Sequence, residues 1–376
     1  MKRAGAGDHQ SAERAGLGGM RFPISRVPNK TAAAIIAVVA LMATLTAGCS
    51  SSSGAGNAPS ISVKGNQLVS GNGKSIHLAG VTRQDTESAC VNNGSAFSDP
   101  SGTASVSILA SWHVNTVRIL LNEDCWLGIN GLETPPADLT YRKAIENYVQ
   151  QLDSAGIVTI IALGFSAHGT QQANGSGAQF MADADHAGAF WSSVAGEFKS
   201  NPSVIFDPFS KPFDISWSCW RNGCLTAMGW KAIGMQQLVD AIRSAGASQP
   251  IMLTGLDEGN DLSGWIANEP HDRLGQLIAS FHVFDVDRCI TDACWTSDIL
   301  GVAKSVPVVA AEVGSYRCSP SLPQSFYSWA KPQGISYLGA YWDVGKCQQG
   351  NSILITTPAG KPSPLGSVLK ASIASS

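Results

Sequence analysis

Eight short apolar runs recur along most of this 376-residue chain, and they constrain its fold more than any other feature. Each run is mostly apolar and does not alternate with polar residues, which is typical of parallel strands that are buried on both faces. The predicted strands are Ser75–Thr82, Val114–Leu121, Ile157–Phe165, Ser203–Ser210, Pro250–Leu256, Ile278–Asp285, Val306–Gly314 and Ile335–Asp343.

Amphipathic helical patterns lie between these runs. In residues 141–155 apolar side chains recur at i, i+3, i+4 and i+7, and residues 187–199 and 230–245 are similar. Eight strands that alternate with helices over about 300 residues predict an α/β protein with a single-domain (β/α)8 or TIM-barrel fold. A doubly wound open sheet is the alternative, but no Gly-x-Gly-x-x-Gly follows the first strand.

The N-terminal segment has the features of an export signal. Thr31 to Gly48 is uncharged and mostly apolar, basic residues precede it, and Cys49 follows Ala-Gly. We expect a signal peptide over residues 1–48 that ends in a bacterial lipobox, a lipidated Cys49 at the cell surface, and a flexible tether over residues 49–64. The barrel is then expected over residues 65–376. A transmembrane anchor is the alternative, because the run just reaches spanning length.

The remaining eight cysteines form an even set, which in an exported chain favours disulfides over metal ligands. Two pairs have a spacing of five residues and could each close a small loop, and the other four would then join neighbouring loops. The sequence alone leaves this pairing open. No metal site or cofactor is expected, since no Cys-x-x-Cys accompanies a histidine cluster. The eight are Cys90, Cys125, Cys219, Cys224, Cys289, Cys294, Cys318 and Cys347.

The charge of the chain argues against nucleic acid as a partner. The 25 basic and 28 acidic residues give a formal charge of −3. Six of the basic and two of the acidic residues lie in the leader up to Gly48, which leaves 19 and 26 residues and a charge of −7 for the rest. Because nucleic acid binding needs a basic surface, no nucleic acid partner is expected.

Functional side chains are expected at the carboxyl ends of the strands, where barrel enzymes place their chemistry. The seventh run reads Val-Val-Ala-Ala-Glu-Val-Gly over residues 308–314, which places Glu312 at the barrel mouth. A loop or helix-capping glutamate is the alternative interpretation. The fourth run leads into Phe-Asp-Pro-Phe-Ser-Lys-Pro over residues 206–212, so Lys211 also follows a strand end.

These strand ends resemble glycoside hydrolase family 5, the cellulase-like family of retaining β-glycosidases. Residues 201–212 are similar to the family's Asn-Pro…Ile-Phe-Asp…Asn-Glu-Pro segment. The resemblance covers nearly the whole chain after the tether. Further similar segments lie at residues 115–126, 185–191, 216–220, 260–262 and 281–282.

The resemblance implies a role for four residues that match the family. Arg118 matches the arginine that hydrogen-bonds the nucleophile, and His282 matches a histidine at the end of the sixth strand. Glu312 matches the catalytic nucleophile itself. Trp342 matches the aromatic platform beneath the sugar.

Five other positions depart from the family pattern. Lys211 stands where the family has its acid/base glutamate, and Ser210 replaces the asparagine that binds the sugar 2-hydroxyl. Gly164 replaces a histidine and Phe284 replaces the tyrosine that hydrogen-bonds the nucleophile. Ala340 stands where relatives often have a second tryptophan. The departures indicate that the acid and sugar-positioning half of the site is lost.

Lysine cannot do the work of the acid/base glutamate. Retaining glycosidases use two carboxyl groups about 5–5.5 Å apart, and lysine has a reference pKa of about 10.4. We expect an ion pair between Lys211 and Glu312, with a solvated lysine at the rim as the alternative. Asp207 should be a buried structural carboxylate, whereas Asp214 and Glu258 are candidate replacement acids.

Tryptophans are candidate sugar-stacking residues, because sugars bind flat rings by their apolar faces. Trp191, Trp230 and Trp329 fall in helical patterns and are expected to pack in the core. Those in loops or at strand ends could line a cleft, although Trp126 and Trp220 could instead pack beside disulfides. They are Trp126, Trp217, Trp220, Trp295 and Trp342.

The sequence therefore predicts an exported, lipid-anchored barrel that binds a β-linked glucan or related oligosaccharide, with hydrolysis impaired. One alternative is a working retaining endo-β-glucanase with Glu312 as nucleophile and an unrecognised acid. Another is a surface scaffold that binds a protein and no sugar.

Overall fold

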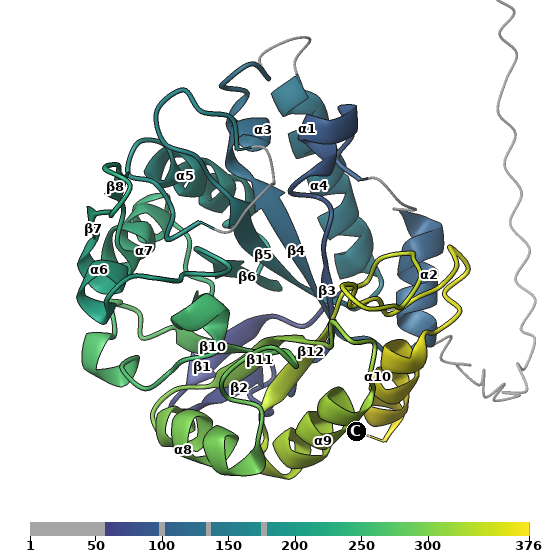
Figure 1. Ribbon diagram of the computed structural model, residues 1–376. Coiled ribbons are helices and arrows are strands. Elements are labelled where there is room, and N and C mark those ends of the chain that lie inside the picture. Colours follow the sequence, from purple (N-terminus) through teal and green to yellow (C-terminus); the bar gives the residue numbers. More distant parts are fainter. Residues whose placement is uncertain (1–56, 98–101, 133–136, 174–178, 376) are drawn as a thin grey trace, which may run out of the picture. The chain divides into compact units, whose positions relative to one another are not determined.

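A computed structural model describes residues 57–97, 102–132, 137–173 and 179–375 (Figure 1). Eight parallel strands close into a barrel in chain order, which confirms the (β/α)8 prediction. Every predicted run overlaps one of them, and no strand extends more than one residue beyond its run. The barrel strands are β3 (Ala79–Arg83), β4 (Thr116–Asn122), β5 (Val158–Phe165), β6 (Val204–Asp207), β9 (Ile251–Thr254), β10 (Leu277–Val283), β11 (Val308–Val313) and β12 (Ser336–Ala340).

Helices surround the barrel strands, as Figure 1 shows. Two predicted helices are present nearly as expected, but the third begins later than predicted, at Met235, because Trp230 lies in a turn before a short strand. The helices are α1 (Ala89–Asn93), α2 (Thr103–Ser111), α3 (Glu123–Leu127), α4 (Ala137–Ser154), α5 (Ala187–Phe198), α6 (Trp217–Asn222), α7 (Met235–Ser244), α8 (Asp292–Ala303), α9 (Ser321–Ala330) and α10 (Pro364–Ala374).

A β-hairpin closes the amino end of the barrel. It consists of β1 (Ile61–Lys64) and β2 (Gln67–Ser70), and its Ile61 and Leu68 join the apolar cluster formed by inward-facing side chains of the barrel. The backbone N–H of Ile61 donates to the carbonyl of Pro202, just before β6. The predicted tether boundary at residue 64 is therefore wrong, because Ile61 is buried by packing in this hairpin.

Between the barrel and its helices lies a larger apolar layer that is rich in aromatic side chains. Among them are several fully buried tryptophans whose indole N–H groups find backbone partners. Trp220 donates to the carbonyl of Thr254, and Trp265 donates to that of Leu253. These contacts fix α6 and the loop that carries Trp265 against β9, because a buried indole N–H needs a hydrogen-bond partner.

Four disulfides are formed, and they include the two pairs that a spacing of five residues suggested. The other four cysteines pair as Cys90–Cys125 and Cys318–Cys347. In Cys219–Cys224 and in Cys289–Cys294 the two cysteines are five positions apart, so each disulfide closes a short loop. The cysteines of Cys90–Cys125 are 35 positions apart and those of Cys318–Cys347 are 29 positions apart. Cys90–Cys125 connects α1 to α3 on the face where β3 and β4 end. The longer crosslinks fix loops next to the barrel mouth.

No helix within the described ranges is long and apolar enough to cross a membrane. The expected signal peptide, Cys49 and the first part of the tether lie outside those ranges, so export and lipidation stay predictions.

Candidate active site

The barrel brings four charged or ionisable side chains together near its carboxyl end, with Arg118 reaching there from the middle of its strand. They are Arg118, His282, Glu312 and Lys211. Arg118 lies on β4, His282 on β10 and Glu312 on β11, and Lys211 follows β6. The side chains of Arg118 and Glu312 are fully buried, whereas that of Lys211 is 28% exposed. The barrel topology thus joins residues that lie up to 194 positions apart in the chain.

Arg118 organises the floor of the site through three hydrogen bonds. Its Nε donates to Asp207 Oδ2, one terminal nitrogen donates to Glu312 Oε1, and the other donates to Ser210 Oγ, each at 2.8 Å. A guanidinium can bind three acceptors at once because its N–H donors lie in one plane and point in different directions. Asp207 is fully buried as predicted, and Ser210 is 2% exposed and bound to this arginine.

Glu312 is held by cations and a hydroxyl on both of its oxygens. Oε1 accepts from Arg118, while Oε2 accepts from Tyr341 at 2.6 Å and lies 2.9 Å from Lys211 Nζ. Burial alone would raise the pKa of Glu312, but the charges of Lys211 and Arg118 hold it well below its usual range. Glu312 is therefore ionised at neutral pH.

Lys211 makes the ion pair with Glu312 that we expected from the sequence, so it is not a solvated lysine at the rim. Its Nζ also donates to Tyr341 Oη at 2.7 Å. The rings of Phe284 and Tyr341 lie 5.7 and 5.3 Å from Nζ, within cation–π range. Burial would lower the pKa of Lys211, but the charge of Glu312 raises it. Lys211 is thus a fixed cation.

His282 is a neutral, buried ring beside the carboxylate. Its Nδ1 lies 3.9 Å from Glu312 Oε2, and burial lowers the pKa of His282 to about 3. The ring packs against Gly259, where an added Cβ would lie 2.6 Å from His282 Cγ. Gly259 also has a φ of +96°, so both conformation and space require glycine there.

Tyr341 is the functional candidate that the sequence reasoning missed. It follows β12 directly, so it lies at a strand end like the other site residues. Its hydroxyl donates to Glu312, which is the contact that Phe284 cannot make. Phe284 instead stacks on Tyr316, with ring centroids 4.7 Å apart. The position of Tyr341 at a strand end could have identified it as a candidate site residue. The family resemblance instead pointed to the next residue, Trp342.

Trp342 does not fit the role of an open sugar platform. It is 2% exposed and packs edge-on against Trp112, with ring centroids 5.0 Å apart. The prediction that loop tryptophans line a cleft is also wrong for Trp126, Trp220 and Trp295, which are buried. Only Trp217 of that set is partly exposed. The three buried tryptophans pack inside the protein, which is the alternative that we stated for Trp126 and Trp220.

Partly exposed aromatic rings form a row next to Lys211 instead. We define the aromatic row as His168, Trp230, Phe180 and Phe213. Consecutive ring centroids lie 5.2, 6.4 and 5.1 Å apart, and the first two pairs are stacked. The backbone N–H of Phe213 donates to the carbonyl of Phe180, which fixes one end of the row two residues after Lys211. We expected Trp230 to lie in a helix and to pack in the core. This prediction is wrong, because Trp230 lies outside the helices and is partly exposed.

Gly164 leaves space that Glu87 fills. A Cβ at position 164 would lie 3.0 Å from Leu120 Cβ and 3.1 Å from Glu87 Cβ, so a larger side chain would require movement. Glu87 is 3% exposed, and its Oε2 has no hydrogen-bond partner among the described residues. Burial raises the pKa of Glu87 to about 8, so this carboxyl is mostly neutral at pH 7.

We expect Glu87→Gln to stabilise the protein at neutral pH, because the amide imitates the neutral carboxyl without having to bind a proton. The raised folded pKa makes the native state bind more protons than the unfolded state, so wild-type stability from Glu87 falls as pH rises from about 4.5 to 8. The gain should be on the order of 3 kcal/mol at pH 7 and small at pH 5. Urea unfolding at both pH values measures it, and an equal effect at both would contradict the assignment.

A pocket of about 420 Å³ opens beside Lys211. Its lining includes Glu258, Phe284, Asp287 and Tyr316. Glu258 has a φ of +56°, and its N–H donates to the carbonyl of Pro212, next to Lys211. Burial raises the pKa of Asp287 to about 7. Of the two candidate acids from the sequence, Glu258 lines this pocket and Asp214 is not among its lining residues.

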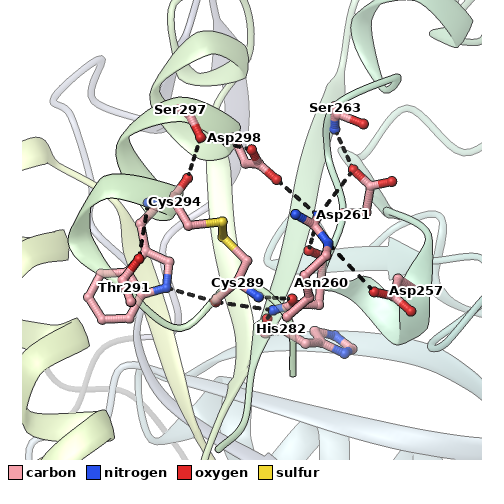
Figure 2. Close-up of a disulfide and its surroundings, with 12 residues drawn as sticks. Asp257, Asn260, Asp261, Ser263, His282, Cys289, Thr291, Cys294, Ser297 and Asp298 are labelled. Atoms are coloured by element: carbon pink, nitrogen blue, oxygen red, sulfur yellow. Dashed lines mark hydrogen bonds and ion pairs between the residues drawn. A yellow bond between two sulfur atoms is a disulfide. The ribbon is translucent and has the colours of Figure 1, made fainter. Parts of the chain in front are cut away.

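A disulfide-linked loop supports one wall of this pocket (Figure 2). Asn260 bridges it to β10, because its amide donates to the carbonyl of His282 at 2.8 Å and accepts from the N–H of Cys289 at 2.6 Å. Arg288 forms ion pairs with Asp261 and Asp298. These contacts hold the loop that carries Asp287 close to the end of β10.

The closed parallel barrel with a buried, ionised glutamate near its carboxyl end places this chain among the barrel proteins that carry their functional side chains at the strand ends. The family described as Cellulase (glycosyl hydrolase family 5) matches residues 69–347. The chain therefore belongs to glycosyl hydrolase family 5. No curated protein sequence matches it.

Solved structures of the same fold come from several bacteria. A β-glucanase of Saccharophagus degradans is 18% identical, with a TM-score of 0.64 over 85% of this chain and 94% of that one, and it has also been solved in complex with cellotetraose. The endoglucanase Cel5A of Thermobifida fusca is 14% identical, with a TM-score of 0.61 over 84% and 97%. An endo-β-1,4-glucanase of Xanthomonas axonopodis pv. citri is 17% identical, with a TM-score of 0.57 over 80% and 100%.

Proposed function

We propose that this protein is an exported, lipid-anchored member of the cellulase family that binds β-linked glucan at its barrel mouth with impaired hydrolysis. The observation that carries the proposal is the contact of 2.9 Å between Lys211 Nζ and Glu312 Oε2. In this interpretation Lys211 occupies the acid/base position and neutralises the nucleophile. The leader and Cys49 support export to the bacterial cell surface with a lipid anchor.

Two effects of Lys211 oppose hydrolysis. A lysine that is paired with a carboxylate does not release its proton to a leaving oxygen near neutral pH, and general acid catalysis is worth about 10²–10⁴-fold. The attacking carboxylate is also less available, because Oε2 already accepts hydrogen bonds from Tyr341 and Lys211. Both halves of the retaining mechanism are thereby weakened.

Binding of glucan is supported by the surface around the ion pair. The aromatic row offers flat rings to the apolar faces of sugars, and the pocket beside Lys211 offers carboxylates and a tyrosine to their hydroxyl groups. The Saccharophagus relative binds cellotetraose, which makes cello-oligosaccharides the first ligands to test.

A working retaining endo-β-glucanase is the second candidate function. The observation that favours it is Glu258, which lines the pocket beside Lys211 and is held there by its bond to Pro212. A left-handed conformation in a non-glycine residue is often associated with functional sites. In that case Glu258 would protonate the leaving group and Glu312 would attack.

We expect the wild-type protein to bind cello-oligosaccharides without releasing reducing ends. Trp230→Ala should weaken binding by about 2–10-fold, because a stacked ring contributes roughly 0.5–1.5 kcal/mol. Met228→Ala is the matched control, since Met228 is 73% exposed and outside the aromatic row. Calorimetric titration and a reducing-end assay measure the two properties.

The outcomes of this experiment separate the candidate functions. Released reducing ends that disappear in Glu258→Gln would support the working enzyme. Absence of affinity for a panel of β-glucans would refute the proposal and favour a scaffold that binds protein. A dinitrophenyl β-cellobioside, whose leaving group needs no acid, tests whether Glu312 can form a covalent intermediate at all.

A further inference from the structure

A second group of ionisable side chains lies next to the barrel mouth, separate from the Arg118–Glu312 group. Glu123 is the first residue of α3, Asp183 lies in the connection between β5 and α5, and His186 immediately precedes α5. One ligand atom from each of the three lies within 4.8 Å of the other two. Among the described residues, no ion pair joins this group to Glu312.

Each of the two carboxylates is buried and has one oxygen without a hydrogen-bond partner among the described residues. Glu123 is 0% and Asp183 is 1% exposed, and neither Glu123 Oε2 nor Asp183 Oδ2 has a donor among the described residues. The two carboxyl groups lie within hydrogen-bonding reach of each other. Because ionised carboxylates only accept hydrogen bonds, two of them that face each other require a cation between them, either a shared proton or a metal ion.

His186 completes a ligand set that suits a metal ion. Its Nδ1 lies 3.5 Å from Asp183 Oδ1 and 3.7 Å from Glu123 Oε1. Metal–ligand distances of about 2.0–2.2 Å in a tetrahedral zinc site correspond to about 3.3–3.6 Å between ligands. His186 Nδ1 also lies 3.1 Å from the carbonyl oxygen of Ala167, which it bonds when Nδ1 carries the proton. Metal binding by Nδ1 requires the tautomer with the proton on Nε2, and in that tautomer the carbonyl oxygen could serve as a fourth ligand.

Backbone amides orient these side chains from the outside. Asp183 Oδ1 accepts from the N–H groups of Asp185 and His186, both at 2.8 Å. Glu123 Oε1 accepts from the N–H of Ala167 at 3.4 Å. Such outer contacts fix ligand direction in metal sites, and here they hold Asp183 Oδ1 and Glu123 Oε1, the two oxygens that lie near His186 Nδ1.

We infer that Glu123, Asp183 and His186 form a binding site for a divalent transition-metal ion of the Zn²⁺ type. The imidazole nitrogen favours such an ion over Ca²⁺ or Mg²⁺, which prefer oxygen ligands. The expectation of no metal was argued from cysteine spacing and did not consider this group. Cys289, Cys294 and Asp298 are also close together, but the two cysteines form a disulfide and do not bind metal as thiolates.

A bound ion would connect α3 to the loop that leads into α5. This loop carries His168 and Phe180 of the aromatic row, so the site would stabilise one border of the barrel mouth. Its role would be structural, because no ligand belongs to the Arg118–Glu312 group. The inference does not depend on glucan binding or on the state of Lys211.

The test is titration of ZnCl₂ into the untagged chain after dialysis against EDTA. We expect one Zn²⁺ per chain and a rise in Tm of about 5 °C at a hundredfold excess over the dissociation constant. His186→Ala and Glu123→Gln should each weaken Zn²⁺ affinity by at least about tenfold. His271→Ala, which removes an exposed histidine elsewhere, is the matched control and should bind as wild type does.

Three results would overturn the inference. They are no Zn²⁺ binding by the wild-type protein, unchanged affinity in both His186→Ala and Glu123→Gln, or equal weakening in His271→Ala. The first would leave the shared proton as the explanation. Circular dichroism without zinc verifies that each variant is folded, and Glu123→Gln preserves the shape of the side chain if His186→Ala does not fold.

Discussion

Lys211→Glu is expected to turn this protein from a glucan binder into a measurable β-glucanase. The substitution supplies the second carboxyl group of the retaining mechanism and removes the cation that holds Glu312 Oε2 at 2.9 Å. Two nearby carboxyl groups raise the pKa of one of them, which suits an acid at neutral pH. We expect hydrolysis to rise by about 10²–10⁴-fold, as measured by reducing ends released from soluble β-glucan. The increase in hydrolysis should lie toward the lower end of this range, because Ser210 and Phe284 still replace two residues of the family's site.

Lys211→Met is the matched control for this experiment. It removes the same ion pair but supplies no acid, so it should improve reaction with dinitrophenyl β-cellobioside and leave glucan intact. Equal glucan hydrolysis by both variants would mean that the acid is elsewhere. Adding Glu258→Gln to each variant would then identify that residue directly.

Removal of Arg118 should destabilise the fold more than any other single change at the site. Its guanidinium is fully buried and compensates two carboxylates, Asp207 and Glu312. Loss of one partner of a buried ion pair costs about 3–5 kcal/mol, because the remaining charge stays buried without compensation. We therefore expect Arg118→Met to lower the free energy of unfolding by at least that amount, as measured in urea.

The charge explanation can be separated from lost packing by a second variant. Arg118→Met combined with Asp207→Asn removes a negative charge together with the positive one and leaves Lys211 to balance Glu312. It should recover part of the lost stability. A double variant that is less stable than Arg118→Met alone would show that packing, and not charge, explains the effect.

The barrel could be predicted from the sequence because its strands are buried on both faces. That burial forces continuous apolar runs, and each of the eight predicted runs overlaps a strand. The β1 strand was missed because Ile-Ser-Val-Lys at residues 61–64 is short and follows a polar stretch. Trp230 was placed in a helix because the apolar periodicity begins at residue 230. In the structure β8 (Lys231–Ala232) pairs with β7 (Cys224–Leu225) there, and the helix begins only at Met235.

The site was predictable only in part, for a related reason. Strand ends converge by topology, so Arg118, His282, Lys211 and Glu312 could be placed together without coordinates. Exposure of an aromatic ring in a loop depends on what packs over it, and sequence pattern carries no such information. This is why Trp342 and three other tryptophans were expected at the surface and are buried.

Tyr341 illustrates a third limit. A family pattern indicates which residue is missing, here the tyrosine replaced by Phe284, but not which neighbour supplies its hydroxyl group. The replacement comes from a different strand, 29 residues beyond Glu312. Only the spatial arrangement of β11 and β12 connects the two.

The hairpin of β1 and β2 lies at the end of the barrel opposite the site, which is useful in experiments. The chain enters the barrel at the amino ends of the strands, whereas Glu312 and Lys211 lie at the carboxyl ends. A support, label or fusion partner joined before Ile61 would therefore attach on the side opposite the mouth. The end of α10 also lies beside the segments that lead into β3 and β4, because Ile373 and Ala374 line a pocket with His77 and Asn115. Immobilisation at either of these two places should leave access of long polysaccharides to the site unhindered.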